Sequence, residues 1–386
     1  MRNKLIDTAR DHLSSNGEAR FFVNSYLERI LDNYDDGVDE SDKVRLVHAF
    51  ASVVTEAPVN YSPEVHIDGL KIKNKEFNLG RSYSLRPVSE DDLALEFRSE
   101  GKALNSSGFG QFAPMGVVEF EVQTEDISNV FNKRDSVLST LQLYDLVSLC
   151  EVTINPNPLL RGHLSRRPAY GIRRRDVPQL PYQMQLDENS DGERLARFFE
   201  EIQPIVHHRV SKSSTDTFVS IAFNRYQNAL VDDDSEESRL TSAIMSLEAL
   251  FLGNEGELSD KLSRRTGILL GHEGENEIEV YDKIKQAYRV RSNYVHASKD
   301  QSGRENNQPD NINKLTDRVL DYTRRCIIIA LQLSNEMVEE KSVTMRSAKK
   351  RILNDIQNAS LNDDARESFH ETFDDAVEFR TESRGQ

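Results

Sequence analysis

An arginine and a histidine lie close together in the segment Tyr288-Arg-Val-Arg291-Ser-Asn-Tyr-Val-His296. The planar guanidinium group of arginine can bind two phosphate oxygens at once. The imidazole of histidine titrates near neutral pH, so it can accept or donate a proton under physiological conditions. Arg291 and His296 could therefore neutralise an anionic group and move a proton beside it.

The periodicity of apolar residues predicts a helix over residues 276–297 that carries this pair. At 100° per residue, Arg291 lies on the same stripe as Ile284, which otherwise faces apolar partners. A guanidinium group buried there needs a carboxylate, because either charge alone carries a large desolvation cost. Glu248, on the buried stripe of the predicted helix at 237–252, is the expected partner, with Arg265 of the next helix as a rival partner for the same carboxylate.

His296 lies about 140° around this helix from Arg291 and about 7.5 Å further along the axis. Two side chains placed in this way on one helix do not converge well. If the helix packs against its twin across a two-fold axis, each arginine can approach the histidine of the other chain. We therefore expect a homodimer through the motif helix.

Three segments in order resemble the HEPN superfamily, and more closely its Apea-like subgroup, over residues 216–338. The segments are Leu247-Glu-Ala-Leu-Phe251, Glu257-Leu-Ser-Asp-Lys-Leu-Ser-Arg-Arg265 and Tyr288-Arg-Val-Arg-Ser-Asn-Tyr-Val-His296. The mark of that family is an arginine, usually followed by a polar residue, with a histidine four to six residues further on. Ala297 departs from the pattern, since the subgroup usually has glycine there.

The resemblance implies a metal-independent endoribonuclease that acts as a toxin or an antiphage defence effector. RNA supplies its own nucleophile, the 2′-hydroxyl, so His296 would act as the general acid or base and Arg291 would stabilise the charged phosphate. The resemblance implies neither a metal nor a cofactor. The alternative is a noncatalytic HEPN protein that binds a nucleotide or RNA, or that regulates a partner. An antitoxin or activating partner would suit a toxin, and no residue identifies one.

Four further residues are candidates for supporting roles. Ser292 follows the motif arginine, and Asn293 lies one helical turn from both Arg289 and His296, where it could orient the imidazole or bind phosphate. Arg289 also falls within the permitted spacing of the motif. Glu248 is better explained as a salt-bridge partner than as an acid or base. Arg291 and His296 could also have purely structural roles, Arg291 in an ion pair and His296 as a histidine at the end of a helix.

The net charge of −16 argues against broad affinity for nucleic acid, so any contact with RNA must be local. One stretch is strongly basic. It contains Arg161, Arg166, Arg167, Arg173, Arg174 and Arg175. These arginines could grip a phosphate backbone, or they could form a solvated loop that pairs with the protein's own carboxylates. We name them as the predicted RNA-binding residues.

The pattern along the chain predicts an α+β fold overall. A mixed α/β domain at the N-terminus is followed by an all-α bundle and a helical tail. An N-terminal α+β domain is expected over residues 1–209, with helices in 1–57, then strands, and a helix from Ile127 to Leu149. An all-α HEPN-like bundle is expected over 210–340, and a charged helical tail over 341–386. The N-terminal domain could sense a signal, restrain the nuclease or select RNA, and no residue there decides among these roles.

Within the second half, helices are expected at about 216–230, 237–252, 257–270, 276–297 and 312–339. A short helix from Glu193 to Ile205 is expected inside an otherwise polar connection. The loop 301–311 is long enough to act as a flap beside His296.

The N-terminus lacks the apolar stretch of a secretory signal, and no apolar run approaches the length of a membrane span. We therefore expect a cytoplasmic protein that does not contact membranes. Cys150 and Cys326, the only cysteines, lie apart in apolar contexts, so neither a disulfide framework nor a thiolate metal site is expected.

Overall fold

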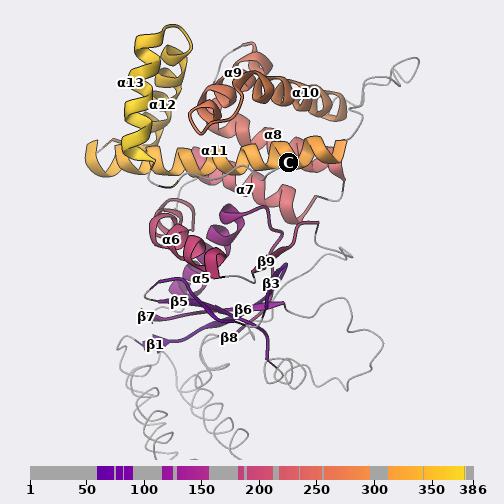
Figure 1. Cartoon of the computed structure of the whole chain (residues 1–386), viewed down its shortest axis with the longest axis vertical. Coiled ribbons are helices and arrows are strands. Elements are labelled where there is room, and N and C mark those ends of the chain that lie inside the picture. The colour runs from indigo at the N-terminus through magenta and orange to yellow at the C-terminus, as the bar shows by residue number, and fades with distance from the viewer. Residues whose placement is uncertain are drawn as a thin grey trace, which may run out of the picture. The chain divides into compact units, whose positions relative to one another are not determined.

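The protein has an α+β fold in a computed structural model, with an antiparallel sheet region that includes a helix, followed by a helical part (Figure 1). The structure describes residues 59–73, 75–80, 82–89, 115–124, 128–155, 181–186, 189–211, 217–233, 235–253, 256–295, 312–341, 343–377 and 379. These residues form two compact units. The described residues up to Arg134, with Cys150–Asn155, belong to the sheet unit, and Asp135–Leu149 and the described residues from 181 onward belong to the helical unit.

The sheet unit contains short antiparallel strands that alternate between an apolar and a polar face. Its strands are β1 (Val59–Tyr61), β2 (Glu64–Asp68), β3 (Leu70–Ile72), β4 (Phe77–Asn78), β5 (Tyr83–Arg86), β6 (Gly116–Phe120), β7 (Val122–Thr124) and β8 (Cys150–Asn155). Five of them form one sheet in the order β4-β5-β6-β2-β8, and β1 pairs with β7.

The register of the central strands explains the two faces of this sheet. Val118 of β6 is paired with Val65 of β2 and with Leu85 of β5, and all three side chains are buried. Side chains alternate along a strand, so the neighbouring positions point the other way. At one such row Glu119 is paired with Glu64 and Ser84. Burial of the apolar row fixes the register, and the polar row then lies together on the opposite face.

The helical unit contains most of the helices that the structure describes. After α5 (Ser128–Tyr144), which is divided between the two units, come α6 (Asn189–Val206), a π-helical turn (His207–Ser211), α7 (Phe218–Val231), α8 (Glu236–Phe251), α9 (Leu258–Gly271), α10 (Glu277–Val295), α11 (Ile312–Lys341), α12 (Met345–Ala359) and α13 (Asp363–Ala376). A short strand, β9 (Met184–Leu186), precedes α6.

One continuous apolar core joins these helices. The helix α11 supplies a long buried segment from Tyr322 to Leu333 that packs against α7, α8 and α10. The helices α12 and α13 lie side by side as a hairpin (Figure 1) and add Ile356 and Phe373 to the same core. Lys349 of α12 donates to the carbonyl oxygens of Ala249 and Leu252, at 2.7 and 2.8 Å, so the hairpin also caps the C-terminal end of α8.

The structure corrects two sequence expectations. The helix predicted to end at Leu149 ends at Tyr144, where Arg324 of α11 donates to the carbonyl oxygens of Leu143 and Tyr144. This tertiary contact satisfies the final carbonyls, and nothing in the local sequence indicates it. The short helix predicted over 193–205 is the longer α6, which buries Phe198 in the bundle core instead of crossing a polar connection.

Several expectations lie outside the described residues. They are the helices within 1–57, the loop 301–311, the basic stretch from Arg161 to Arg175, and His296. Among the residues that the structure does describe, no helix is both long enough and apolar enough to cross a membrane.

Candidate functional site

The helix that carries the motif, α10, begins at a well-defined cap. The side-chain oxygen of Asn276 accepts hydrogen bonds from the backbone N–H groups of Ile278 and Glu279, at 3.0 and 3.1 Å. Glu277 and Glu279 add negative charge to the first turn, where the helix dipole favours it. The local sequence therefore sets where α10 starts.

Contacts with α9 and α11 fix the position of that first turn. A Cβ atom built on Gly267 of α9 would lie only 2.9 Å from the carbonyl oxygen of Glu277, so the two helices approach too closely for any larger residue. In the turn between α9 and α10, Glu273 and Glu275 accept hydrogen bonds from Arg325 of α11, at 2.8 and 2.5 Å. The start of α10 is thus held on two sides.

Arg291 lies near the other end of α10, on the edge of its buried face. Val280, Ile284 and Ala287 are fully buried on this face. The Nη2 atom of Arg291 donates to Oε2 of Glu248, the last-turn carboxylate of α8, at 3.2 Å. The pair expected from the sequence is therefore present, and a single hydrogen bond joins the two side chains.

The rival partner, Arg265, is also buried but binds elsewhere. Its Nη1 atom donates to the carbonyl oxygen of Phe251 at 2.5 Å, and its Nη2 atom lies 3.5 Å from the side-chain oxygen of Gln357. Arg265 thus helps to close the C-terminal end of α8 against α9 and α12.

Burial and two neighbouring side chains act in opposite directions on the pKa of the Glu248 carboxyl group. Burial raises its pKa above the usual range, and the charge of Arg291 and a hydrogen bond from Tyr288 lower it only in part. Burial and the negative charge of Glu248 in turn raise the pKa of the Tyr288 hydroxyl, which therefore remains protonated and can donate. Tyr288, Glu248 and Arg291 form one polar group at this end of α10, and Tyr288 was not among the residues selected from the sequence.

Most donors of Arg291 remain uncommitted within the described part of the chain. A guanidinium group has five N–H donors. One of them binds Glu248, and the buried Nε atom has no acceptor among the described residues. The guanidinium carbon lies 5.5 Å from the centre of the Tyr288 ring, and the side chain is 21% exposed. Arg291 is therefore anchored at one point, with donors left for an anion.

The other predicted motif residues lie around this anchor. Ser292 is partly buried, and Arg289 and Asn293 are exposed on α10. Tyr294 and Val295 end the helix with side chains that are 50% and 51% exposed. The remaining motif residue, His296, follows directly in the sequence but lies outside the described residues.

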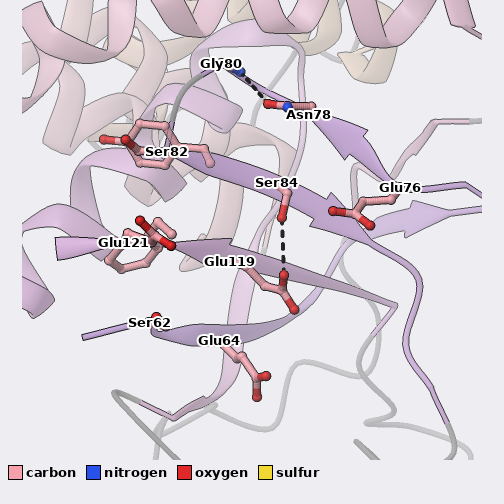
Figure 2. A pocket seen from close by; sticks show the side chains of 11 residues that line it. Ser62, Glu64, Glu76, Asn78, Gly80, Ser82, Ser84, Glu119 and Glu121 are labelled. Atoms are coloured by element: carbon pink, nitrogen blue, oxygen red, sulfur yellow. Dashed lines mark hydrogen bonds between the residues drawn. The ribbon is translucent and has the colours of Figure 1, made fainter. Parts of the chain in front are cut away.

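A pocket that sequence reasoning missed lies on the polar face of the sheet unit (Figure 2). It has a volume of about 360 Å³ and is lined by Glu64, Glu76, Glu119 and Glu121, among others. Arg86 binds Oε1 of Glu119, and its Nη2 atom lies 3.7 Å from Oε1 of Glu64. Ser84 donates to the other oxygen of Glu119 at 3.3 Å (Figure 2). The sequence does carry a sign of this pocket, because polar residues stand at alternate positions of two of its strands.

This pocket is a poor place for a nucleic acid. Four carboxylates face it, and Arg86 is already shared between two of them. Negative charge on both sides would repel a phosphate backbone. Its polar surface suits hydroxyl groups or cations better than anions.

A larger hollow of about 650 Å³ lies in the helical unit, away from Arg291. It is lined by both acidic and basic side chains, including Glu236 and Arg239 of α8 and Asp317 and Arg318 of α11. Tyr182 donates to Asp317 there, at 2.8 Å. Glu236 and Glu248 lie at the two ends of α8, about 18 Å apart along the helix axis. The hollow is therefore separate from the Arg291 site.

Comparison of the chain with models of known protein families, with curated proteins and with solved structures found no match.

Proposed function

We propose that the helical unit is an HEPN-type domain and that the protein is a metal-independent endoribonuclease, acting as a toxin or antiphage defence effector. One observation carries this proposal. Arg291 is anchored by Glu248, which Tyr288 also binds, while its 21% exposed side chain keeps N–H donors for an anion next to the sequence position of His296. The resemblance of the three sequence segments supports the same assignment.

The reaction follows from the chemistry of the two motif residues. His296 accepts the proton of the ribose 2′-hydroxyl as that oxygen attacks the adjacent phosphorus. Arg291 stabilises the additional negative charge on the phosphorane oxygens. The bond from phosphorus to the 5′-oxygen then breaks, and this oxygen takes up a proton. The products are a 2′,3′-cyclic phosphate and a 5′-hydroxyl end.

Cleavage of total RNA by the purified protein in EDTA tests this proposal. We expect cleavage to persist in EDTA, with a cyclic phosphate on the upstream product. Arg291→Ala should slow cleavage about 100- to 1,000-fold, the usual effect of losing a charge-stabilising donor. His296→Ala should slow it about 100- to 10,000-fold.

Folding must be preserved in both variants, which circular dichroism and thermal unfolding would show. Cleavage that persists undiminished in both variants would instead favour the noncatalytic alternative, a protein that binds RNA or nucleotide or regulates a partner.

The active form in this proposal is a homodimer through α10. The buried apolar face of α10 is covered by its own bundle, so it cannot be the contact surface that the sequence pattern suggested. The exposed side chains of Tyr294 and Val295 offer an apolar contact at the motif end of the helix. Such a contact would allow Arg291 of one copy to approach His296 of the other.

Light scattering at micromolar protein concentration tests the dimer. We expect a dimer for the natural chain and a shift toward monomer for Tyr294→Glu with Val295→Lys, accompanied by loss of cleavage. A strict monomer under conditions in which RNA is cut would contradict the composite site.

A further inference from the structure

The second half of α10 carries positive charge that no acidic residue of the same segment offsets. Residues 283–296 contain Lys283, Lys285, Arg289 and Arg291 and no aspartate or glutamate, in a chain whose net charge is −16. Two of these cations, Lys285 and Arg289, are four residues apart and lie on the side of α10 away from its buried face. Asn293, four residues further on, is also exposed.

Lys285, Arg289 and Asn293 therefore form a file along the helix that turns by about 40° at each step. Each step is one helical turn, about 6 Å along the axis. This step is comparable to the distance between neighbouring phosphates in an RNA strand. Lys and Arg can each bind a phosphate oxygen, and the amide N–H₂ of asparagine can donate to another.

The nearest carboxylate does not cancel the charge of this file. Asp260 of α9 is shared by two cations: it lies 3.2 Å from Arg264 and 3.8 Å from Lys285. It also accepts a hydrogen bond from the Tyr281 hydroxyl at 2.6 Å. The side chain of Arg264 is 57% exposed, so this cation stands beside the start of the file and adds to it.

The spacing of Lys285 and Arg289 is unfavourable in the absence of an anion. Like charges four residues apart destabilise a helix. The bond to Tyr281 raises the pKa of the Lys285 ammonium group, whereas the nearby positive charge of Arg289 lowers it. A bound phosphate would relieve this repulsion, and water or salt would do so only weakly.

We propose that Lys285, Arg289 and Asn293, with Arg264 beside them, bind the backbone of single-stranded RNA and lead it along α10 toward Arg291. The inference rests on the proposed function for its substrate; it adds Lys285 and Arg264 to the RNA contacts and gives Arg289 and Asn293 the role of binding the RNA backbone. These residues bind phosphates, so the file binds RNA without regard to base sequence. The file spans about 12 Å along α10, which is enough for two or three phosphates.

The decisive comparison uses two double variants that remove the same charge. Lys285→Gln with Arg289→Gln neutralises the file, and Lys350→Gln with Arg351→Gln neutralises two exposed cations on α12. Both variants change the net charge equally, so any difference between them is local. Binding is measured by fluorescence anisotropy with a labelled single-stranded RNA of mixed sequence, with His296→Ala added throughout to keep the RNA intact.

We expect the file variant to lose two phosphate contacts and the α12 variant to lose none. Each contact contributes about 0.7 to the slope of log affinity against log salt for single strands, so the slope should flatten by about 1.4. This corresponds to roughly 25-fold weaker binding at 0.1 M salt. Asn293→Asp, which keeps the shape and adds a negative charge, should weaken binding in the same direction. In the cleaving protein the loss should fall on KM more than on kcat.

Equal affinity and equal salt slope for the two double variants would overturn the inference. If the natural chain cuts RNA in EDTA and the file variant cuts with unchanged KM, the inference fails and the proposed function stands. If the natural chain binds RNA without cutting it and the file variant binds more weakly, the inference stands and the proposed function fails. If the natural chain binds no RNA, both fail.

Discussion

An arginine side chain lies at each end of α10, and the two differ in how many carboxylates they contact. Arg325 of α11 lies at the N-terminal end, and Arg291 of α10 itself lies at the C-terminal end. At the N-terminal end, Arg325 is 1% exposed and donates to both Glu273 and Glu275. At the C-terminal end, Arg291 is 21% exposed and has one carboxylate partner, Glu248. The first arginine faces two acids in the interior, and the second faces one acid near solvent.

The difference indicates which charge serves the fold and which can serve a ligand. Burial opposes the charge on Arg325, but the attraction and hydrogen bonds of Glu273 and Glu275 outweigh it and raise its pKa. Such a group has little capacity left for a further anion. Arg291 retains donors, and its carboxylate partner has a raised pKa because burial dominates there. A charge pair in a fold therefore says little about function until its unused donors are counted.

The largest expected effect on stability is at Arg325. Arg325→Met leaves the buried Glu273 without its cation, and removal of one partner of a buried pair typically costs about 3–5 kcal/mol. We expect this loss in the free energy of unfolding in urea, whereas Arg291→Met should cost about 1 kcal/mol or less. Adding Glu273→Gln and Glu275→Gln to Arg325→Met should restore most of the stability. Similar losses of stability for Arg291→Met and Arg325→Met would show that both arginines serve the fold to the same extent.

How far the sequence predicted this contrast depends on whether both partners lie on helices with an apolar stripe. The helix α10 and the pairing of Glu248 with Arg291 followed from helical stripes, because each stripe is a local pattern. The partners of Arg325 lie some fifty residues away, in a turn. In the sequence Arg325 stands next to the apolar run that begins at Cys326, and no stripe marks its partners. Which loop meets a buried cation is decided by tertiary packing, and no local period records it.

The same reasoning explains why two other features of the structure could not be found from the sequence. Tyr288 follows Ile284 by one helical turn on the stripe that faces apolar partners, and helical periodicity does not reveal that its hydroxyl donates to Glu248. The pocket lined by Glu64 and Glu119 depends on the register between β2 and β6, which is fixed by burial of Val65 against Val118. Sequence alternation predicts polar faces but not which strands bring them together.

A second prediction extends the comparison to the six arginines between Arg161 and Arg175. If they behave like Arg291 and retain donors for phosphate, neutralising Arg173, Arg174 and Arg175 should weaken RNA binding across sequences. Loss of up to three phosphate contacts should also flatten the slope of log affinity against log salt, by roughly 0.7 for each contact. Cleavage of bound RNA should survive, because the motif is intact. Unchanged affinity and slope would show that these arginines pair with the protein's own carboxylates.

The smallest expected effect concerns the charge state of Glu248 and how stability changes with pH. Because burial raises the folded-state pKa of Glu248, the folded protein holds this proton more tightly than the unfolded chain does. The stability gained in this way is fully present below the ordinary carboxyl pKa, about 4.3 for glutamate. It is lost as the pH rises through that value and through the raised folded-state pKa. Glu248→Gln keeps the shape of the side chain and does not titrate.

The expected result is a pH-dependent difference between Glu248→Gln and the natural chain. The variant should gain stability relative to the natural chain as the pH rises from 4 to 7, by about 1 kcal/mol or less, the usual range for a pair near the surface. Urea unfolding at several pH values measures this difference, and Glu236→Gln, the same substitution at the other end of α8, serves as a matched control. If the variant instead loses stability as the pH rises, attraction to Arg291 outweighs burial at Glu248. Arg291 would then be bound as firmly as Arg325, and the contrast between the two ends of α10 would disappear.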